Sequence, residues 1–144
     1  MHIRFHRAAL ALWLLAGGAG AAEPAAPLSA EQRWASRLEM QKLLVQVNGD
    51  LCAQKVPAKA AGYGAAVKQW YARHDAEFKE ALTARLRSGV LVTEQQMGEL
   101  AAADAPALEA WLAGLGLSDK DRFSEHYCDT FTGNLDSLPS IPRH

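Results

Sequence analysis

Apolar side chains recur every three or four residues between residues 59 and 88, and this spacing limits the fold more than any other feature of the chain. The apolar stripe consists of Tyr63, Val67, Trp70, His74, Phe78, Leu82 and Leu86. Charged side chains occupy most of the other positions, which gives the 3.6-residue period of an amphipathic helix. We therefore expect one long helix over 59–88, closed by Gly89.

A second helix is expected over 30–56, before Pro57. Its apolar stripe is predicted to contain Met40, Leu43, Leu44, Val47 and Leu51, with Trp34 and Leu38 widening it near the start. Gly49 costs up to about 1 kcal/mol relative to alanine inside a helix, so it could divide this segment into two pieces. We expect a single helix.

Two more helical segments follow, over 93–116 and 119–138. Within the first of them, Asp104 and Pro106 predict a fresh helix start, because proline fits the first helical turn. In the last segment Ser118 is the expected N-cap. The apolar spacing of that segment is carried by Phe123, Tyr127, Phe131 and Leu135.

The helix starts share a capping pattern. It occurs as Leu28-Ser29-x-x-Gln32 and as Val92-Thr93-x-x-Gln96. A serine or threonine N-cap followed by glutamine at the third helical position satisfies two backbone N–H groups reciprocally. The same letters distantly resemble the L-T-x-x-Q motif of small helical periplasmic stress chaperones, over about ten residues.

The helices, the short turns between them and the lack of any strand pattern predict an all-α fold. We expect a small helical bundle of four to five helices that forms a single domain over 29–138. A flexible leader (22–28) is expected before this domain and an irregular C-terminal segment (139–144) after it, because both are rich in proline.

Residues 1–21 have the pattern of a cleaved signal peptide. Arg4 and Arg7 precede an apolar run over 8–16, and Ala19 and Ala21 supply the small residues expected before a cleavage site. The apolar run is about half of the roughly 20 residues that a membrane-spanning helix needs. The sequence therefore predicts export to the periplasm, with no stable membrane insertion after cleavage.

Cys52 and Cys128 are the two cysteines of the chain. Disulfides persist in an oxidising compartment, and two cysteines allow one pairing. We expect a structural disulfide that joins the first and last helices. Redox-active pairs usually lie close together as C-x-x-C, which this spacing does not match.

Charge and composition argue against several partners and cofactors. The formal net charge is −1, and removing Arg4 and Arg7 with the signal peptide makes it more negative. Acids and bases are interspersed without a basic cluster, so nucleic acid is not an expected partner. The sequence contains no haem-attachment motif and no metal-ligand spacing, so no cofactor or metal is predicted.

Two alternative functions remain open on sequence grounds. Arg73-His74-Asp75 resembles the histidine and aspartate dyad of secreted phospholipases A2, which implies a hydrolase using the His74/Asp75 pair. The adjacent cysteine and the glycine-rich calcium loop of that family are missing from this sequence. The other alternative is a helical carrier of a small apolar ligand, with a cavity beneath Trp70 and Phe131.

The leading expectation is a non-catalytic protein that binds another periplasmic or envelope protein, as an inhibitor, an adaptor or an immunity protein against an envelope-targeting toxin. Such a surface usually combines apolar or aromatic contacts with a charged rim. The candidate partner-binding residues are Trp34, Tyr71, Trp111, Glu77 and Glu80. The two glutamates would steer association with a cationic partner.

Overall fold

The computed structural model describes residues 25–143, and within this range it contains four α-helices and no strand. The helices are α1 (Ala30–Lys55), α2 (Ala60–Ser88), α3 (Glu94–Gly114) and α4 (Glu125–Gly133). Three single 3-10 turns lie at Pro57–Lys59, Asp119–Asp121 and Leu135–Ser137. The predicted all-α class is confirmed. The predicted signal peptide lies outside the described residues.

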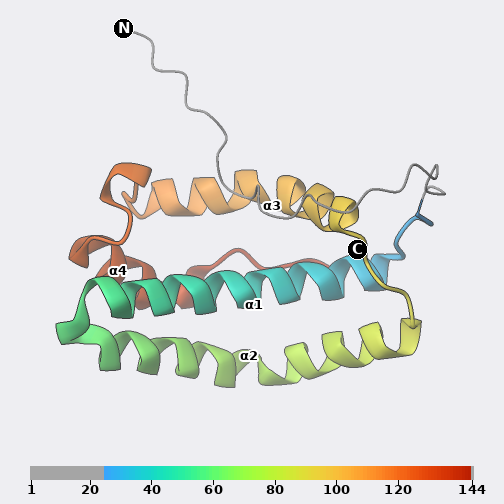
Figure 1. Cartoon of the computed structure of the whole chain (residues 1–144), viewed down its shortest axis with the longest axis horizontal. Helices are drawn as coiled ribbons and strands as arrows, with labels where there is room; N and C mark the ends of the chain where they lie inside the picture. Colours follow the sequence, from blue (N-terminus) through green and yellow to red (C-terminus); the bar gives the residue numbers. More distant parts are fainter. Residues whose placement is uncertain (1–24, 144) are drawn as a thin grey trace, which may run out of the picture.

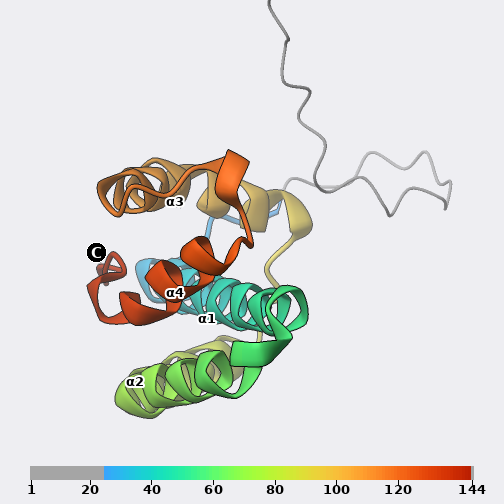
Figure 2. The same ribbon diagram turned by 90° about the vertical axis from the view of Figure 1, so that its left-hand side faces the viewer.

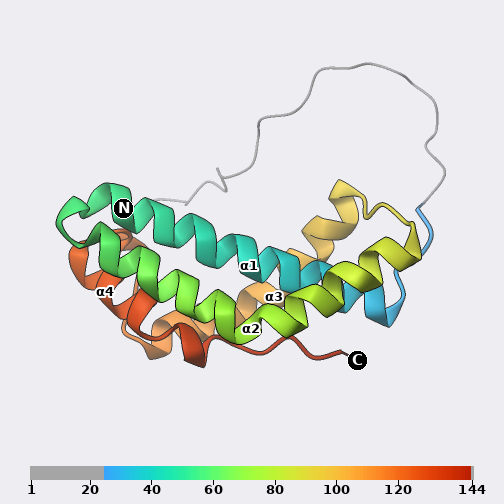
Figure 3. The same ribbon diagram turned by 90° about the horizontal axis from the view of Figure 1, so that it is seen from below.

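The helices form three layers, which Figures 1 and 2 show from two sides. α1 and α2 pack against each other along their length as an antiparallel pair, and α3 lies on the side of α1 opposite to α2. The short α4 fills the space beside α1 between the outer layers. The segment after α4 then runs back along the bundle, as Figure 3 shows from below. We call residues 138–143 the tail.

Local capping explains where three of the helices begin. Ser29 and Thr93 each accept a hydrogen bond from the glutamine backbone three residues later, and each glutamine side chain binds the backbone N–H of its cap. Both predicted capping boxes are therefore confirmed. Gly89 closes α2 in the left-handed conformation, with φ of 61°. α4 is capped by Ser124.

Two predicted boundaries are wrong. α3 continues through Pro106 without a fresh start. Its neighbours are mostly alanines, the strongest helix formers, and the proline is exposed, so water can bind the carbonyl that loses its partner. The predicted helix over 119–138 is instead two 3-10 turns flanking α4, because Phe123 takes a left-handed φ of 61° that no helix accommodates.

The core lies mainly between α1, α2 and α4. Its largest fully buried side chains are Leu38, Val45, Cys52, Trp70, Cys128 and Phe131. The apolar stripe predicted for α1 is wrong in part, since Leu43 and Val47 are exposed while the neighbouring face buries Val45 and Cys52. α3 has a single buried residue, Leu100, so this helix contributes little to the core.

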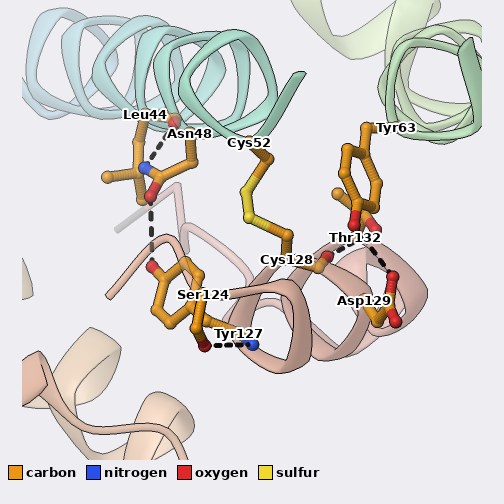
Figure 4. The surroundings of a disulfide bond; sticks show 9 residues. All are labelled: Leu44, Asn48, Cys52, Tyr63, Ser124, Tyr127, Cys128, Asp129 and Thr132. Atoms are coloured by element: carbon orange, nitrogen blue, oxygen red, sulfur yellow. Dashed lines mark hydrogen bonds between the residues drawn. A yellow bond between two sulfur atoms is a disulfide. The ribbon is translucent and has the colours of Figure 1, made fainter. Parts of the chain in front are cut away.

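The predicted disulfide is confirmed and joins the first and last helices. The Cα atoms of Cys52 and Cys128 are 5.5 Å apart, and both side chains are fully buried. Hydrogen bonds flank the bridge on both sides (Figure 4). The Tyr127 hydroxyl donates to Asn48 Oδ1 over 3.1 Å, and the Tyr63 hydroxyl donates to Asp129 Oδ1 over 2.9 Å. α4 is therefore attached to both α1 and α2.

Gly49 allows the close approach of α1 and α2. A Cβ atom at this position would lie 2.6 Å from Val67 Cγ2, well inside van der Waals contact. We expect Gly49→Ala to lower the free energy of unfolding by about 1–3 kcal/mol, although alanine favours the helix, because overpacking outweighs propensity. Chemical denaturation of the purified protein measures this change.

Gly62→Ala in α2 is the matched control, because nothing lies within 4 Å of its added Cβ. It should stabilise the protein by about 0.5–1 kcal/mol. Val67→Ala should also remove most of the cost of Gly49→Ala when the two are combined. An alanine at Gly49 that stabilises the protein as much as the control would contradict the close-packing account.

Candidate functional site

A cleft lies between α1, α3 and the tail, and its walls are mostly apolar. Its polar lining residues are Arg37, Gln41, Asp104 and Ser140. Its volume is about 230 Å³. α1 supplies Met40 and Leu44 to the cleft, and the other apolar lining residues are Ala101, Ala105, Ala107, Leu108, Leu138, Pro139 and Ile141. The sequence leaves this space open because α3 presents alanines, not larger side chains, at positions 101 and 105 on the face towards α1.

One ion pair at the cleft bridges its two helical walls. Arg37 Nε of α1 lies 2.9 Å from both carboxylate oxygens of Asp104 in α3, and the terminal Nη2 also binds this carboxylate. The hydrogen bond to Asp104 raises the pKa of the Arg37 guanidinium above its ordinary value. The Arg37 guanidinium therefore stays charged at neutral pH, and the Asp104 side chain that it binds compensates its charge.

The tail is held as a third wall by polar contacts on two helices. Gln41 Nε2 donates to the carbonyl oxygen of Pro139 over 2.7 Å. Arg143 donates to Glu80 Oε1 of α2 over 2.7 Å, and its guanidinium carbon lies 4.2 Å from the centre of the Trp34 ring. The cleft is thus bounded on a third side by a segment whose position is fixed, and not only by two neighbouring helices.

Of the five predicted partner-binding residues, Trp34 and Glu80 lie close together, since both contact Arg143 of the tail. Trp34 is 3% exposed and packs in a small core with Leu38 and Ala81. Tyr71 and Trp111 are half-buried and use their polar atoms internally, since the Tyr71 hydroxyl binds the Lys42 carbonyl and Trp111 Nε1 donates to a serine of the last turn.

The two predicted glutamates lie on α2, at different degrees of exposure. Glu77 is half-buried, whereas Glu80 is exposed and forms the ion pair with Arg143. The hydrogen bond from Arg143 lowers the pKa of the Glu80 carboxyl. Because Glu80 is already paired within the chain, its charge has less influence on an approaching partner.

Large aliphatic side chains are exposed over the end of α2 and the loop that follows it, and two of them belong to the stripe predicted to be buried. Leu82, Leu86, Val90 and Leu91 are exposed by 54%, 74%, 51% and 89%, and they follow one another over the end of α2 and the loop to α3. We call these four residues the aliphatic end. The apolar stripe of α2 had placed Leu82 and Leu86 in the core. For Val90 and Leu91 a signal was present, because two adjacent aliphatic residues stand in a loop too short to form a sheet.

The His74/Asp75 pair has no dyad geometry in the structure. His74 Nδ1 lies 2.9 Å from the Trp70 carbonyl oxygen. A carbonyl oxygen only accepts, so this nitrogen is the N–H donor of the hydrogen bond. The Asp75 carboxylate forms an ion pair with Lys79 one turn further along α2. Adjacent positions on a helix point about 100° apart, and here they engage different partners.

Both aromatic residues named for the carrier alternative belong to the core. Trp70 and Phe131 are both buried in the core, and the apolar cleft lies elsewhere, against α3.

Within residues 25–143 no group of three or more histidine, cysteine or acidic side chains is placed to hold a metal ion. In the same range, no helix combines the length and the apolar character needed to cross a membrane.

Comparison with known proteins gives no relative. No protein-family model, curated protein or solved structure matches this chain. Arguments about its function therefore rest on its own residues.

Proposed function

We propose that this chain is exported to the periplasm and acts without catalysis, by binding another protein of the envelope as an inhibitor, an adaptor or an immunity protein. The observation that carries this proposal is the aliphatic end. Four large aliphatic side chains, each more than half exposed, occur within the segment from Leu82 to Leu91. Exposed apolar groups that lie close together mark interaction sites in many proteins, because binding a partner removes these groups from water, which lowers the free energy.

The surroundings of the aliphatic end suit a protein interface. Arg85 and Arg87 lie among its leucines and are exposed, and Arg85 forms an ion pair with Glu39 of α1. An apolar centre with arginine at its edge is the usual composition of a binding surface. The loop to α3 presents Val90 and Leu91, which are exposed by 51% and 89%, so a partner can reach them without displacing a helix.

The cellular location is supported by two features. The first 21 residues have the pattern of a signal peptide, and a buried disulfide is compatible with a secreted protein. The non-catalytic part is supported by the separate contacts of His74 and Asp75.

Site-specific photo-crosslinking in the envelope of the native host tests this function. Benzoylphenylalanine in place of Leu91 should crosslink to one protein, which mass spectrometry of the unreduced adduct identifies. The same group in place of Ala110, an exposed residue of α3, is the matched control and should give no such adduct. The additional substitution Val90→Asp should abolish the adduct at position 91, because a carboxylate must be desolvated in an apolar interface.

Two results would contradict this function. One is the absence of any defined adduct at position 91, and the other is equal yields at positions 91 and 110. Circular dichroism of each purified variant shows whether the fold is intact, so that a lost adduct is not mistaken for unfolding.

A further inference from the structure

We propose that the cleft between α1, α3 and the tail binds a small, neutral, apolar molecule. This site is separate from the aliphatic end and adds a ligand to the proposed protein-binding function. Three properties of the cleft carry the proposal: its volume, its charge balance and the way in which its third wall is fixed.

The volume of the cleft sets the size of the ligand. An engineered apolar cavity of about 150 Å³ takes up benzene. At about 230 Å³ this cleft is larger and is open to solvent on one side, so it has room for an aromatic molecule of two or three rings or a short branched hydrocarbon. Small-molecule sites are typically concave and lined mainly by apolar side chains, with a few polar groups.

The charge balance of the lining sets the polarity of the ligand. Arg37 and Asp104 are the charged residues of the lining, and they bind each other. The Gln41 side chain donates to Pro139 of the tail. A charged ligand would lose its hydration shell in this cleft without gaining a free counter-charge, whereas a neutral apolar ligand loses nothing of that kind.

The third wall distinguishes the cleft from a bare gap between two helices. The tail is tied to α1 through Gln41 and to α2 through Arg143. It thereby holds Leu138, Pro139 and Ile141 over the space that Ala101 and Ala105 leave open. A ligand in this space contacts three segments of the chain at once and supplies the dispersion contacts that the alanines do not make.

Titration of the purified, disulfide-bonded protein with the neutral fluorophore N-phenyl-1-naphthylamine tests the site. Its fluorescence rises in apolar surroundings, so binding to the wild-type protein should give a saturable increase. Ala105→Leu places a larger side chain in the cleft and should raise the Kd by about tenfold or more. Ala103→Leu makes the same change at an exposed position of α3 outside the cleft and should leave the Kd unchanged.

Further arms decide the remaining outcomes. The anionic analogue 1-anilinonaphthalene-8-sulfonate should bind more weakly than the neutral dye, and equal or tighter binding would overturn the assignment of a neutral ligand. If Ala105→Leu does not fold, Ala101→Leu at the same wall replaces it. Lack of saturable binding, or equal binding by the Ala105 and Ala103 variants, would overturn the site, the latter by placing the dye elsewhere.

The assay also separates this proposal from the proposed function. It uses the isolated protein and no partner, so a failed crosslink at position 91 does not affect it. If the dye does not bind while Ala105→Leu abolishes the crosslinked adduct, the cleft accepts a side chain of the partner, and the small-molecule proposal is overturned.

Discussion

Replacing Cys52 and Cys128 together by alanine is expected to lower the free energy of unfolding by roughly 4 kcal/mol. The disulfide closes a loop over a sequence separation of 76 residues, so its removal frees a large part of the chain in the unfolded state. This loss is a large share of the total free energy of unfolding of a folded domain, which is usually about 5–15 kcal/mol. Alanine is the suitable replacement because both sites are fully buried, and serine would add two buried hydroxyl groups.

Urea denaturation measures the effect, and the reduced wild-type protein is its control. Reduction removes the same constraint without removing the sulfur atoms, so the two proteins should have similar midpoints. A loss below about 1 kcal/mol in both would show that the unfolded chain is compact enough to make the bridge nearly redundant.

The segment most affected should be α4. It contains nine residues, and helices of that length are not stable alone in water. Without the bridge, its attachment depends on the hydrogen bonds of Tyr127 with Asn48 and of Tyr63 with Asp129. Apolar packing and the exposed ion pairs of Lys59 with Glu125 and Asp129 add to these. Hydrogen exchange should therefore show α4 losing protection before α1 and α2.

The parts of the fold that the sequence predicted well are those set by neighbouring residues. Ser29 with Gln32 and Thr93 with Gln96 form capping boxes from residues three positions apart, and Gly89 provides the left-handed turn that ends α2. The disulfide was predictable for another reason, since two cysteines have one possible pairing.

Which face of a helix is buried was harder to predict. α1 contains two apolar seams: Val45 and Cys52 belong to the core with α2 and α4, whereas Met40 and Leu44 line the cleft beside α3. The 3.6-residue period fits both seams, and only the positions of the neighbouring helices decide between them. The predicted stripe followed the second seam and added Leu43 and Val47, which are exposed.

The boundaries near the C-terminus depended on tertiary context as well. Ser118 and Ser124 both precede segments that could form a helix, and the left-handed residue Phe123 separates them. Nothing local to a phenylalanine predicts that conformation, because it is unfavourable for any residue with a side chain. It is maintained where the chain turns from α3 into α4.

The cleft could not be predicted, because no single segment contains it. Its lining combines α1, α3 and residues of the tail, and the Arg37–Asp104 pair joins positions 67 residues apart. From the sequence alone, the alanines of α3 indicate no more than a favourable helix. These alanines matter because α1 and the tail lie opposite them and leave a cleft. The exposure of Leu82 and Leu86 likewise depends on which segments pack against α2.

Phe131→Ala is the second substitution with a large expected effect. Phe131 is fully buried and stacks on Tyr127 of α4, with ring centres 5.9 Å apart. It also meets the edge of Trp111 of α3, at 5.7 Å between centres. Removing a buried phenylalanine side chain typically costs about 3–5 kcal/mol, from lost burial and the cavity left behind. We expect a loss in this range, measured by guanidinium denaturation.

The contact with Trp111 adds a local consequence, because Leu100 is the one buried residue of α3. α3 depends on the rim of the main core for its attachment, and Phe131→Ala removes the ring against which Trp111 packs. Hydrogen exchange of α3 should therefore increase more than that of α2.

Phe123→Ala is the control for this substitution. Phe123 is half-buried and contacts Tyr127. Its left-handed backbone conformation is unfavourable for phenylalanine and alanine alike, so the substitution does not change the backbone strain. It should cost less, about 1–2 kcal/mol, in keeping with its smaller buried area. Equal losses for the two variants, or unchanged protection of α3, would show that α3 is held by the Arg37–Asp104 pair and the cleft contacts and not by the core.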